Sequence, residues 1–166
     1  MDIEELIHTY GDYLYRIAFI YTKDENAAEE VVQDVFFNFY RKQAQYNGSA
    51  ALKTYLVKMA VNRSYDYLRS WKNKRHVFLE KFQGKTVSTE KLYLHKETRG
   101  EVTAAVLTLP IKFREVLLLY YYEEMTVTEI ANLLETAPST IKSRLQRARA
   151  KLKPLVTDDW EVLTDE

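Results

Sequence analysis

The chain has 166 residues, of which 46% are hydrophobic and 29% are charged, so it can bury a core and is not disordered by composition. It contains no Cys, which excludes disulfides and thiolate metal sites, and only four Gly and three Pro, which favours long helices over a turn-rich β fold. There is no apolar run of about 18 residues and no signal-peptide pattern at the N-terminus, so we expect a cytoplasmic chain that does not insert into membranes. The formal net charge is zero, which taken alone argues against binding to nucleic acid.

Three amphipathic helix patterns occupy the first part of the chain and predict one helical bundle. Asp2 is a suitable N-cap for the first helix, whose inward stripe is Leu6, Ile7, Tyr10, Leu14, Ile17, Ala18 and Tyr21. Asp24 can cap the second, whose stripe is Ala28, Val31, Val32, Val35, Phe36, Phe39 and Tyr40. A polar loop at 43–49 contains Asn47-Gly48. The third helix, from about 51 to about 72, has as its stripe Leu52, Leu56, Met59, Ala60, Tyr67 and Leu68.

The periodicity weakens between residues 76 and 98, which predicts a flexible linker with room for a short helix. A second helical domain follows. Its first apolar stripe ends at Pro110, and a second stripe covers residues 113–120. Thr126 and Glu129 form a capping box before a short helix, and Pro138 suits the start of a last helix that ends near Leu152. The expected fold is all-α, with domains at 1–75 and 99–157, a linker at 76–98 and an acidic tail at 158–166.

Basic residues are concentrated in two segments, although the chain as a whole is neutral. Between Lys53 and Arg75 there are seven basic residues against the single acid Asp66, and between Lys142 and Lys153 there are six against none. Local positive charge of this kind is what a contact to backbone phosphates needs. Charge alone leaves the alternative of two ordinary solvated helix faces equally open.

Residues 126–153 predict a helix-turn-helix, because a capped short helix, a turn and a second helix with a basic outer face follow one another. Arg and Lys can pair with guanine edges and Gln with adenine. The candidate DNA contacts are Lys142, Ser143, Arg144, Gln146, Arg147 and Arg149. A plain helical hairpin with a solvated basic face is the alternative.

The same part of the chain resembles region 4 of the extracytoplasmic-function (ECF) sigma factors, which belong to the sigma-70 family. After a leucine-proline start at Leu109-Pro110, residues 125–134 read MTVTEIANLL and residues 139–149 read STIKSRLQRAR, close to the family patterns L-s-x-x-E-I-A-x-x-L and G-T-V-K-S-R-L-x-R-A-R. Ser139 stands where the family commonly has Gly. Glu135 stands where it commonly has Gly or Asn. The resemblance implies that the last helix reads the minus-thirty-five promoter element.

Residues 28–36, AEEVVQDVF, resemble the region 2 block that docks on the clamp helices of the polymerase β′ subunit. An acidic, amide-bearing face suits a basic coiled-coil partner. The candidate polymerase contacts are Glu29, Glu30, Gln33 and Asp34. A solvated face is one alternative, and a carboxylate pair for a metal is another, although no Glu-x-x-His pattern accompanies it.

Residues 46–63 resemble the block that reads and opens the minus-ten element, although Tyr55 stands where the family usually has Trp. The resemblance places Tyr46 and Asn62 at the pocket for an unstacked base. The full candidate set is Tyr46, Asn47, Tyr55, Lys58, Asn62 and Arg63, with Arg69 and Lys72 as further phosphate contacts. Tyr55 is equally compatible with a place in the core, and Tyr46 with an ordinary loop position.

The resemblance, which covers about residues 10–152, implies a sigma factor that is not an enzyme and needs no cofactor. The implied partners are core RNA polymerase through its β′ clamp helices and β flap, promoter DNA, and an anti-sigma factor, which is often membrane-anchored. One alternative is a repressor or activator with the same helix-turn-helix. Another is a helical enzyme, for instance a metal-dependent one, built on His8, Glu30 and Asp34.

Overall fold

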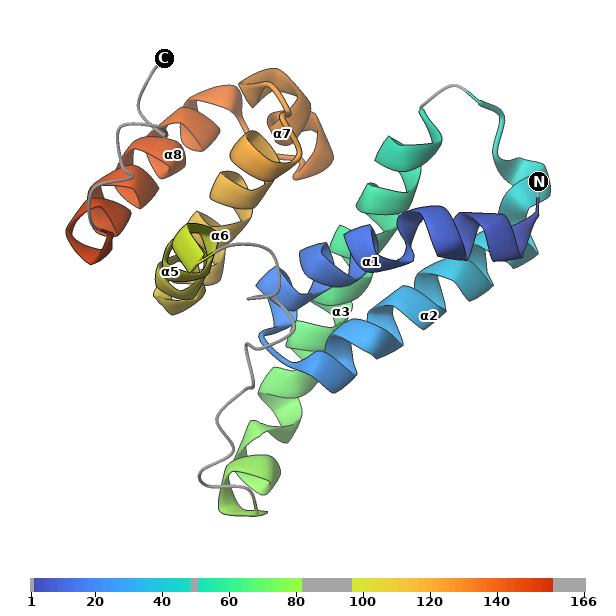
Figure 1. Ribbon diagram of the computed structural model, residues 1–166, viewed down its shortest axis with the longest axis horizontal. Coiled ribbons are helices and arrows are strands. Elements are labelled where there is room, and N and C mark those ends of the chain that lie inside the picture. The colour runs from blue at the N-terminus through green and yellow to red at the C-terminus, as the bar shows by residue number, and fades with distance from the viewer. Residues whose placement is uncertain (1, 49–50, 82–96, 157–166) are drawn as a thin grey trace. The chain divides into compact units, whose positions relative to one another are not determined.

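The computed structural model describes residues 2–48, 51–81 and 97–156, and of residues 71–81 and 97–99 it describes the backbone alone. All regular structure within these ranges is helical (Figure 1), which confirms the all-α prediction. The chain divides into two compact units, Met1–Ser88 and Thr89–Glu166. In the described ranges, no helix is both long and apolar enough to cross a membrane.

The first unit is a bundle in which α1 (Ile3–Thr22), α2 (Glu25–Lys42) and α3 (Leu52–Lys81) pack on one another, with a 3₁₀ turn η1 (Gln43–Gln45) after α2. Both predicted N-caps are confirmed. Oδ1 of Asp2 accepts a hydrogen bond from Glu4 N at 3.0 Å, and Oδ1 of Asp24 accepts one from Ala27 N at 2.8 Å. Each carboxylate thereby satisfies a backbone donor that the first helical turn leaves unpaired.

The core of this unit confirms most of the predicted stripes, since Leu14, Ile17, Val31, Val35 and Phe39 are buried. Two predicted core positions are wrong, however, because Ile7 and Tyr40 are exposed. Each lies next to a buried residue in sequence, and a step of one residue turns a helix by about 100°, which carries the side chain out of the packed stripe. Two further core residues, Val57 and Val61, lie outside the predicted stripe of the third helix.

The end that the sequence predicted for the third helix, near residue 72, is wrong, because α3 continues to Lys81. Its apolar stripe weakens there, but the stretch 73–81 contains no Gly or Pro to end a helix. The predicted linker at 76–98 therefore begins as helix, and its central part, 82–96, lies outside the described residues. The acidic tail also lies outside them, so the exact domain boundaries stay predictions.

The second unit contains α5 (Glu97–Thr108), α6 (Ile111–Leu117), a π-helical turn η2 (Leu118–Tyr122), α7 (Val127–Leu133), α8 (Pro138–Leu152) and a 3₁₀ turn η3 (Lys153–Leu155). The wide turn η2 ends where Met125 N donates a hydrogen bond of 3.0 Å to Leu119 O. Glu124 lies within this closure and has a φ of 54°. Of the three consecutive tyrosines, Tyr120 and Tyr121 are half-buried and Tyr122 is exposed.

The helix-turn-helix is present as α7 and α8. Its capping box is confirmed, since Glu129 N donates to Thr126 Oγ1 at 3.1 Å and Thr126 N donates to Glu129 Oε2 at 2.9 Å. Pro138 occupies the first turn of α8, as predicted. The turn between the helices places Glu135 at a φ of 52°, the conformation that Gly or Asn adopts most readily. The buried side of this unit includes Ile130, Ala131, Ile141, Leu145, Ala148 and Leu152.

Candidate functional site

The outer side of α2 carries the predicted polymerase contacts. Glu29, Glu30 and Gln33 are exposed and Asp34 is partly exposed, because the buried side of the helix is occupied by Val31 and Val35. We call Glu29, Glu30, Gln33 and Asp34 the acidic face. Its carboxylates and amide provide acceptors and negative charge to a basic partner.

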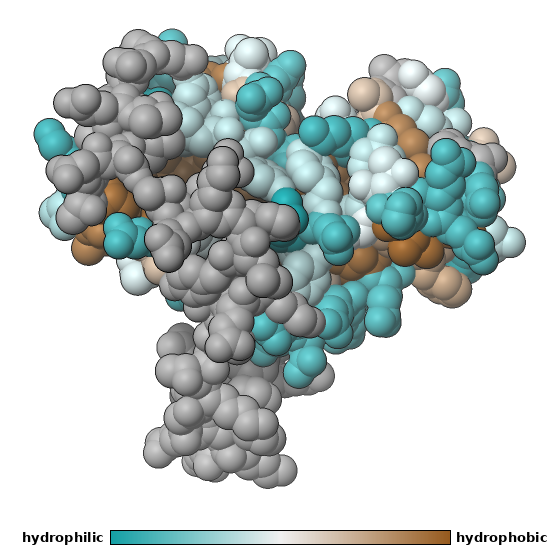
Figure 2. Space-filling view, in the orientation of Figure 1, coloured by the Kyte–Doolittle hydropathy of each residue, from teal (hydrophilic) through white to brown (hydrophobic). Residues whose placement is uncertain are grey.

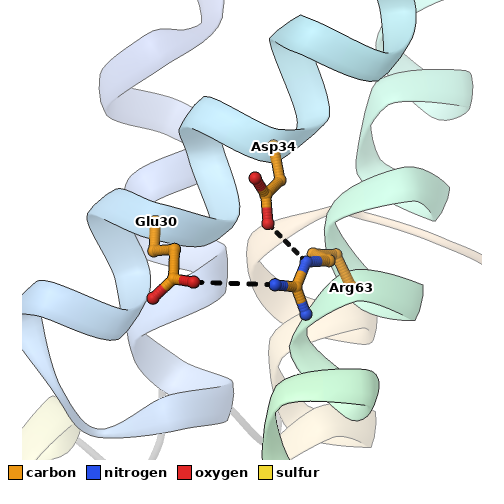
Figure 3. Close-up of polar contacts among 3 residues, drawn as sticks. All are labelled: Glu30, Asp34 and Arg63. Carbon is orange, nitrogen blue, oxygen red and sulfur yellow. Dashed lines mark hydrogen bonds and ion pairs between the residues drawn. The ribbon is translucent and has the colours of Figure 1, made fainter.

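Glu30 and Asp34 both point toward α3, where they meet Arg63 (Figure 3). Nε of Arg63 donates a hydrogen bond of 2.6 Å to Oδ2 of Asp34, and Nη2 lies 3.8 Å from Oε1 of Glu30. The structure thus brings together two residues predicted to bind polymerase and one predicted to bind DNA. The sequence analysis did not pair them.

Two exposed aromatic residues extend the acidic face toward the end of α2. Phe37 is 60% exposed and Tyr40 is 57% exposed, and the guanidinium carbon of Arg41 lies 5.6 Å from the centre of the Phe37 ring. Phe37 follows Gln33 by one helical turn, and Tyr40 follows Phe37 by three residues, so both continue the same side of the helix. Figure 2 shows hydrophobic side chains at the surface among hydrophilic ones in the part of the view that α1 and α2 occupy. The helical period alone could have placed Phe37 on this face.

The predicted base pocket begins at a cluster of three aromatic rings. The Tyr46 ring lies 5.2 Å from the Tyr55 ring and 6.2 Å from that of Phe39, and Tyr55 lies 6.1 Å from Phe39. Phe39 is buried, whereas Tyr46 and Tyr55 are half-buried. Tyr55 therefore packs on the core while part of its residue surface stays exposed to solvent. This position is compatible with a place in the core and also with stacking on a base.

The other predicted minus-ten residues lie on the loop and on α3. Asn47, Lys58 and Asn62 are exposed. Lys58 and Asn62 are one helical turn apart, and Asn62 lies two turns beyond Tyr55, so the three share one side of α3. Arg63 instead leans toward α2, away from this row. The Lys72 side chain lies outside the described residues.

The outward side of α8 presents four of the six predicted minus-thirty-five contacts. Lys142, Ser143, Gln146 and Arg147 are exposed, opposite the buried stripe of the helix. These four residues form what we call the outer row. Lys142 and Ser143 lie in the N-terminal half of the helix, which is the part that a recognition helix inserts into the major groove, and Gln146 and Arg147 lie about one turn further along.

The other two predicted contacts, Arg144 and Arg149, are half-buried and interact within their own unit. Nη1 of Arg144 lies 3.9 Å from Oε1 of Glu115, whose side chain is 3% exposed. Nε of Arg149 donates a hydrogen bond of 2.6 Å to the Tyr121 hydroxyl. The sequence did not predict Glu115 and Tyr121 as partners, because both fall within an apolar run that is typical of plain core.

Tyr15, a half-buried residue of α1, has a buried hydroxyl and senses the charges at the acidic end of α2. Burial raises the pKa of Tyr15 to about 12, and the negative charges of Glu25, Glu29 and Asp24 add to this effect. Its hydroxyl has no hydrogen-bond partner among the described residues. Burial also raises the pKa of Tyr67, with smaller contributions from Asp24 and Glu30. The acidic residues at this end of the bundle therefore make it harder to deprotonate the two neighbouring tyrosines.

Within the described ranges, no three His, Asp or Glu side chains converge as a metal site would require. Glu30 and Asp34, which the metal-enzyme alternative needs, converge on a cation of the chain itself.

Comparison with known proteins bears directly on the family. The family description "Sigma-70 region 2" matches residues 6–75, and "Sigma-70, region 4" matches residues 99–152. The chain is 32% identical to the ECF RNA polymerase sigma factor SigM of Bacillus subtilis over 161 residues, which cover 93% of this chain and 95% of that one. It is 24% identical to SigW of the same organism, over 93% of this chain and 88% of that one.

Two solved structures share the fold. One is the sigma factor RpoE in complex with the anti-sigma factor NepR from Bartonella quintana, with a TM-score of 0.75, 23% identity and 99% coverage of both chains. The other is CnrH in complex with the cytosolic domain of CnrY, with a TM-score of 0.64 and 21% identity over 99% of this chain and 89% of that one. On the two family matches and the likeness to SigM, the chain belongs to the ECF sigma factors of the sigma-70 family, and it is an RNA polymerase sigma factor rather than an enzyme.

Proposed function

We propose that the acidic face, together with Phe37 and Tyr40, docks on the β′ clamp helices of core polymerase. The exposure of this row supports the proposal, because acidic side chains favour a basic coiled coil and exposed aromatic rings supply the apolar anchors typical of interfaces. The second unit binds the β flap in this scheme, and its exposed Tyr122 and Leu155 are the apolar side chains that it offers.

Promoter recognition is divided between the two units. The outer row of α8 reads the minus-thirty-five element, and the aromatic cluster with Asn62 holds an unstacked base of the minus-ten element. The observation that carries this proposal is the exposure of Lys142, Ser143, Gln146 and Arg147 opposite the buried side of a helix-turn-helix. Arg144 and Arg149 position α8 rather than contact DNA, because their guanidinium groups are engaged within the unit.

An anti-sigma factor is the regulatory partner in this proposal, anchored in a membrane. The fold shared with RpoE, which was solved in complex with the anti-sigma factor NepR, supports the partner class. The fold shared with CnrH, which was solved with the cytosolic domain of CnrY, supports the anchoring, because a partner with a separate cytosolic domain is typical of a membrane protein. Such a partner must cover surfaces that polymerase or promoter DNA needs. In the first unit, we expect the anti-sigma factor to cover the exposed aromatic rings of α2, because burial of aromatic rings contributes most to the affinity of an interface.

The docking proposal is tested by measuring the affinity of the purified chain for core polymerase. Gln33→Ala combined with Phe37→Ala is expected to weaken binding by at least tenfold, since removal of a central aromatic anchor commonly costs 2 kcal/mol or more. The triple change of Glu30, Gln33 and Asp34 to Ala tests the polar groups of the acidic face, with circular dichroism to confirm folding. Unchanged affinity of both folded variants contradicts the docking assignment. Ile7→Ala, which truncates an exposed apolar side chain of α1, is the matched control.

A further inference from the structure

Arg63 lies between the acidic face and the row of α3 proposed to hold the minus-ten strand. It projects from α3, but Asp34 and Glu30 of α2 hold its guanidinium. The side chain of Arg63 is 31% exposed and that of Asp34 is 36% exposed, so solvent and a partner can reach both. A residue expected to neutralise phosphate is thus already partly neutralised by the chain itself.

Two carboxylates one turn apart converge on a single guanidinium, so the three groups together carry one net negative charge at neutral pH. A DNA phosphate that approaches Arg63 must either displace Asp34 or accept its repulsion, because like charges at close range oppose binding. A basic helix that approaches Glu30 and Asp34 is opposed in the same way by the positive charge of Arg63. The two partners therefore need opposite rearrangements of the same ion pair.

We propose that Arg63 is a shared cation: Asp34 and Glu30 retain it in the free chain, and docking of polymerase on these carboxylates releases it to the phosphate backbone of promoter DNA. This inference rests on the proposed docking of the acidic face. Binding is reciprocal, so a phosphate that takes Arg63 frees the carboxylates and strengthens docking by the same factor. Polymerase and DNA then favour each other through one side chain.

The first test uses the free full-length chain and a labelled single-stranded oligonucleotide of mixed sequence, without polymerase. Asp34→Asn keeps the shape of the side chain but removes its charge, and it is expected to raise DNA affinity about two- to fivefold, the range measured for exposed ion pairs. In an Arg63→Gln background, Asp34→Asn is expected to change affinity no more than Asp12→Asn does. Asp12→Asn, which removes an exposed charge of α1, is the matched control for general electrostatics. An equal gain from Asp34→Asn in both backgrounds overturns the proposal.

The second test measures affinity for core polymerase. Arg63→Gln is expected to strengthen it about two- to fivefold when Asp34 is present, and to have a smaller effect when Asp34 is replaced by Asn, because only Glu30 then holds Arg63. Arg69→Gln is the matched control, because Arg69 lies on the same helix and pairs with Asp66 at 3.9 Å. Weaker polymerase binding by Arg63→Gln overturns the shared-cation proposal.

The two tests separate this inference from the docking assignment. Suppose that Asp34→Asn leaves polymerase affinity unchanged but still raises DNA affinity in the free chain. The carboxylates then hold Arg63 away from DNA without being the docking site. That outcome overturns the release of Arg63 by polymerase, although Asp34 still limits the DNA affinity of the free chain. Arg63 is partly buried, so Arg63→Gln could disturb folding, and Arg63→Lys is a second, more conservative variant. It keeps the charge but loses the Nε donor, and it is expected to fall between the parent and Arg63→Gln in both assays.

Discussion

Arg149, on the recognition helix, donates a hydrogen bond of 2.6 Å to the hydroxyl of Tyr121, which lies 28 residues earlier in the chain. Its guanidinium carbon also lies 5.4 Å and 5.5 Å from the centres of the Tyr120 and Tyr121 rings. These contacts attach α8 to the π-helical turn η2. An arginine that the sequence predicts as a DNA contact thereby holds α8, the helix proposed to read DNA, against η2.

Arg149→Ala is therefore expected to lower the thermal stability of the second unit and to weaken minus-thirty-five binding without changing its salt dependence. A lost phosphate contact would lower the slope of log affinity against log salt by about one. The measurement is closed-complex formation by the holoenzyme at several salt concentrations. Arg147→Ala is the comparison, with an expected cost of about 1–3 kcal/mol concentrated on the preferred promoter sequence. A slope reduced by one at unchanged stability would identify Arg149 as a phosphate contact.

Arg144→Ala is expected to destabilise the chain by roughly 1–3 kcal/mol, because it removes the ion pair between the Arg144 guanidinium and the buried carboxylate of Glu115. Urea unfolding measures the change. Arg147→Ala, which truncates an exposed arginine of the same helix, should stay within about 0.5 kcal/mol of the parent. Equal stabilities of the two variants would show that Arg144 is not needed inside the unit.

Asn62→Ala and Tyr46→Ala are expected to leave minus-thirty-five binding intact and to reduce promoter opening, read as permanganate reactivity of unpaired thymines. Stacking on an aromatic ring contributes about 1–3 kcal/mol per base, and extrusion of a base from the duplex costs a few kcal/mol. A template with a pre-melted bubble should restore much of the signal. Variants that open linear DNA as well as the parent would exclude these two residues from the pocket.

Tyr15→Phe is expected to stabilise the folded chain by about 1 kcal/mol at neutral pH, because it removes a buried hydroxyl that has no partner among the described residues. The unfolded chain loses the phenol proton near pH 10, whereas the folded pKa is about 12. The folded state therefore binds this proton more tightly, and the parent loses stability as the pH rises from 10 toward 12. The advantage of the variant should grow over that range in unfolding experiments. Tyr40→Phe controls for the loss of an exposed hydroxyl, and a constant advantage would contradict the assignment.

Sequence signals predicted best those features that form within a single turn of helix. The caps at Asp2, Asp24 and Thr126 need only a side chain and a backbone donor a few residues away, so their spacing is visible in the sequence. Glu135 marks a limit, because the turn was predicted but its left-handed backbone was not. Propensity gives little warning of a non-glycine residue in that conformation.

The candidate sites were predicted as sets of residue types, and their pairing was not. The bonds from Arg63 to Asp34 and from Arg149 to Tyr121 span 29 and 28 residues, so they depend on how two helices pack. No periodicity within one helix contains that information. A count of basic residues treats each arginine as a free charge, whereas the fold assigns some of them to partners. The DNA and polymerase contacts themselves stay predictions.

The bare rings of Phe37 and Tyr40 also affect how the free protein behaves in concentrated solution. A chain with a formal net charge of zero at pH 7 has little long-range repulsion to keep its copies apart. Exposed aromatic side chains on one helix then favour self-association. Near neutral pH, the isolated chain should accordingly be less soluble than the same chain co-expressed with a partner that covers α2.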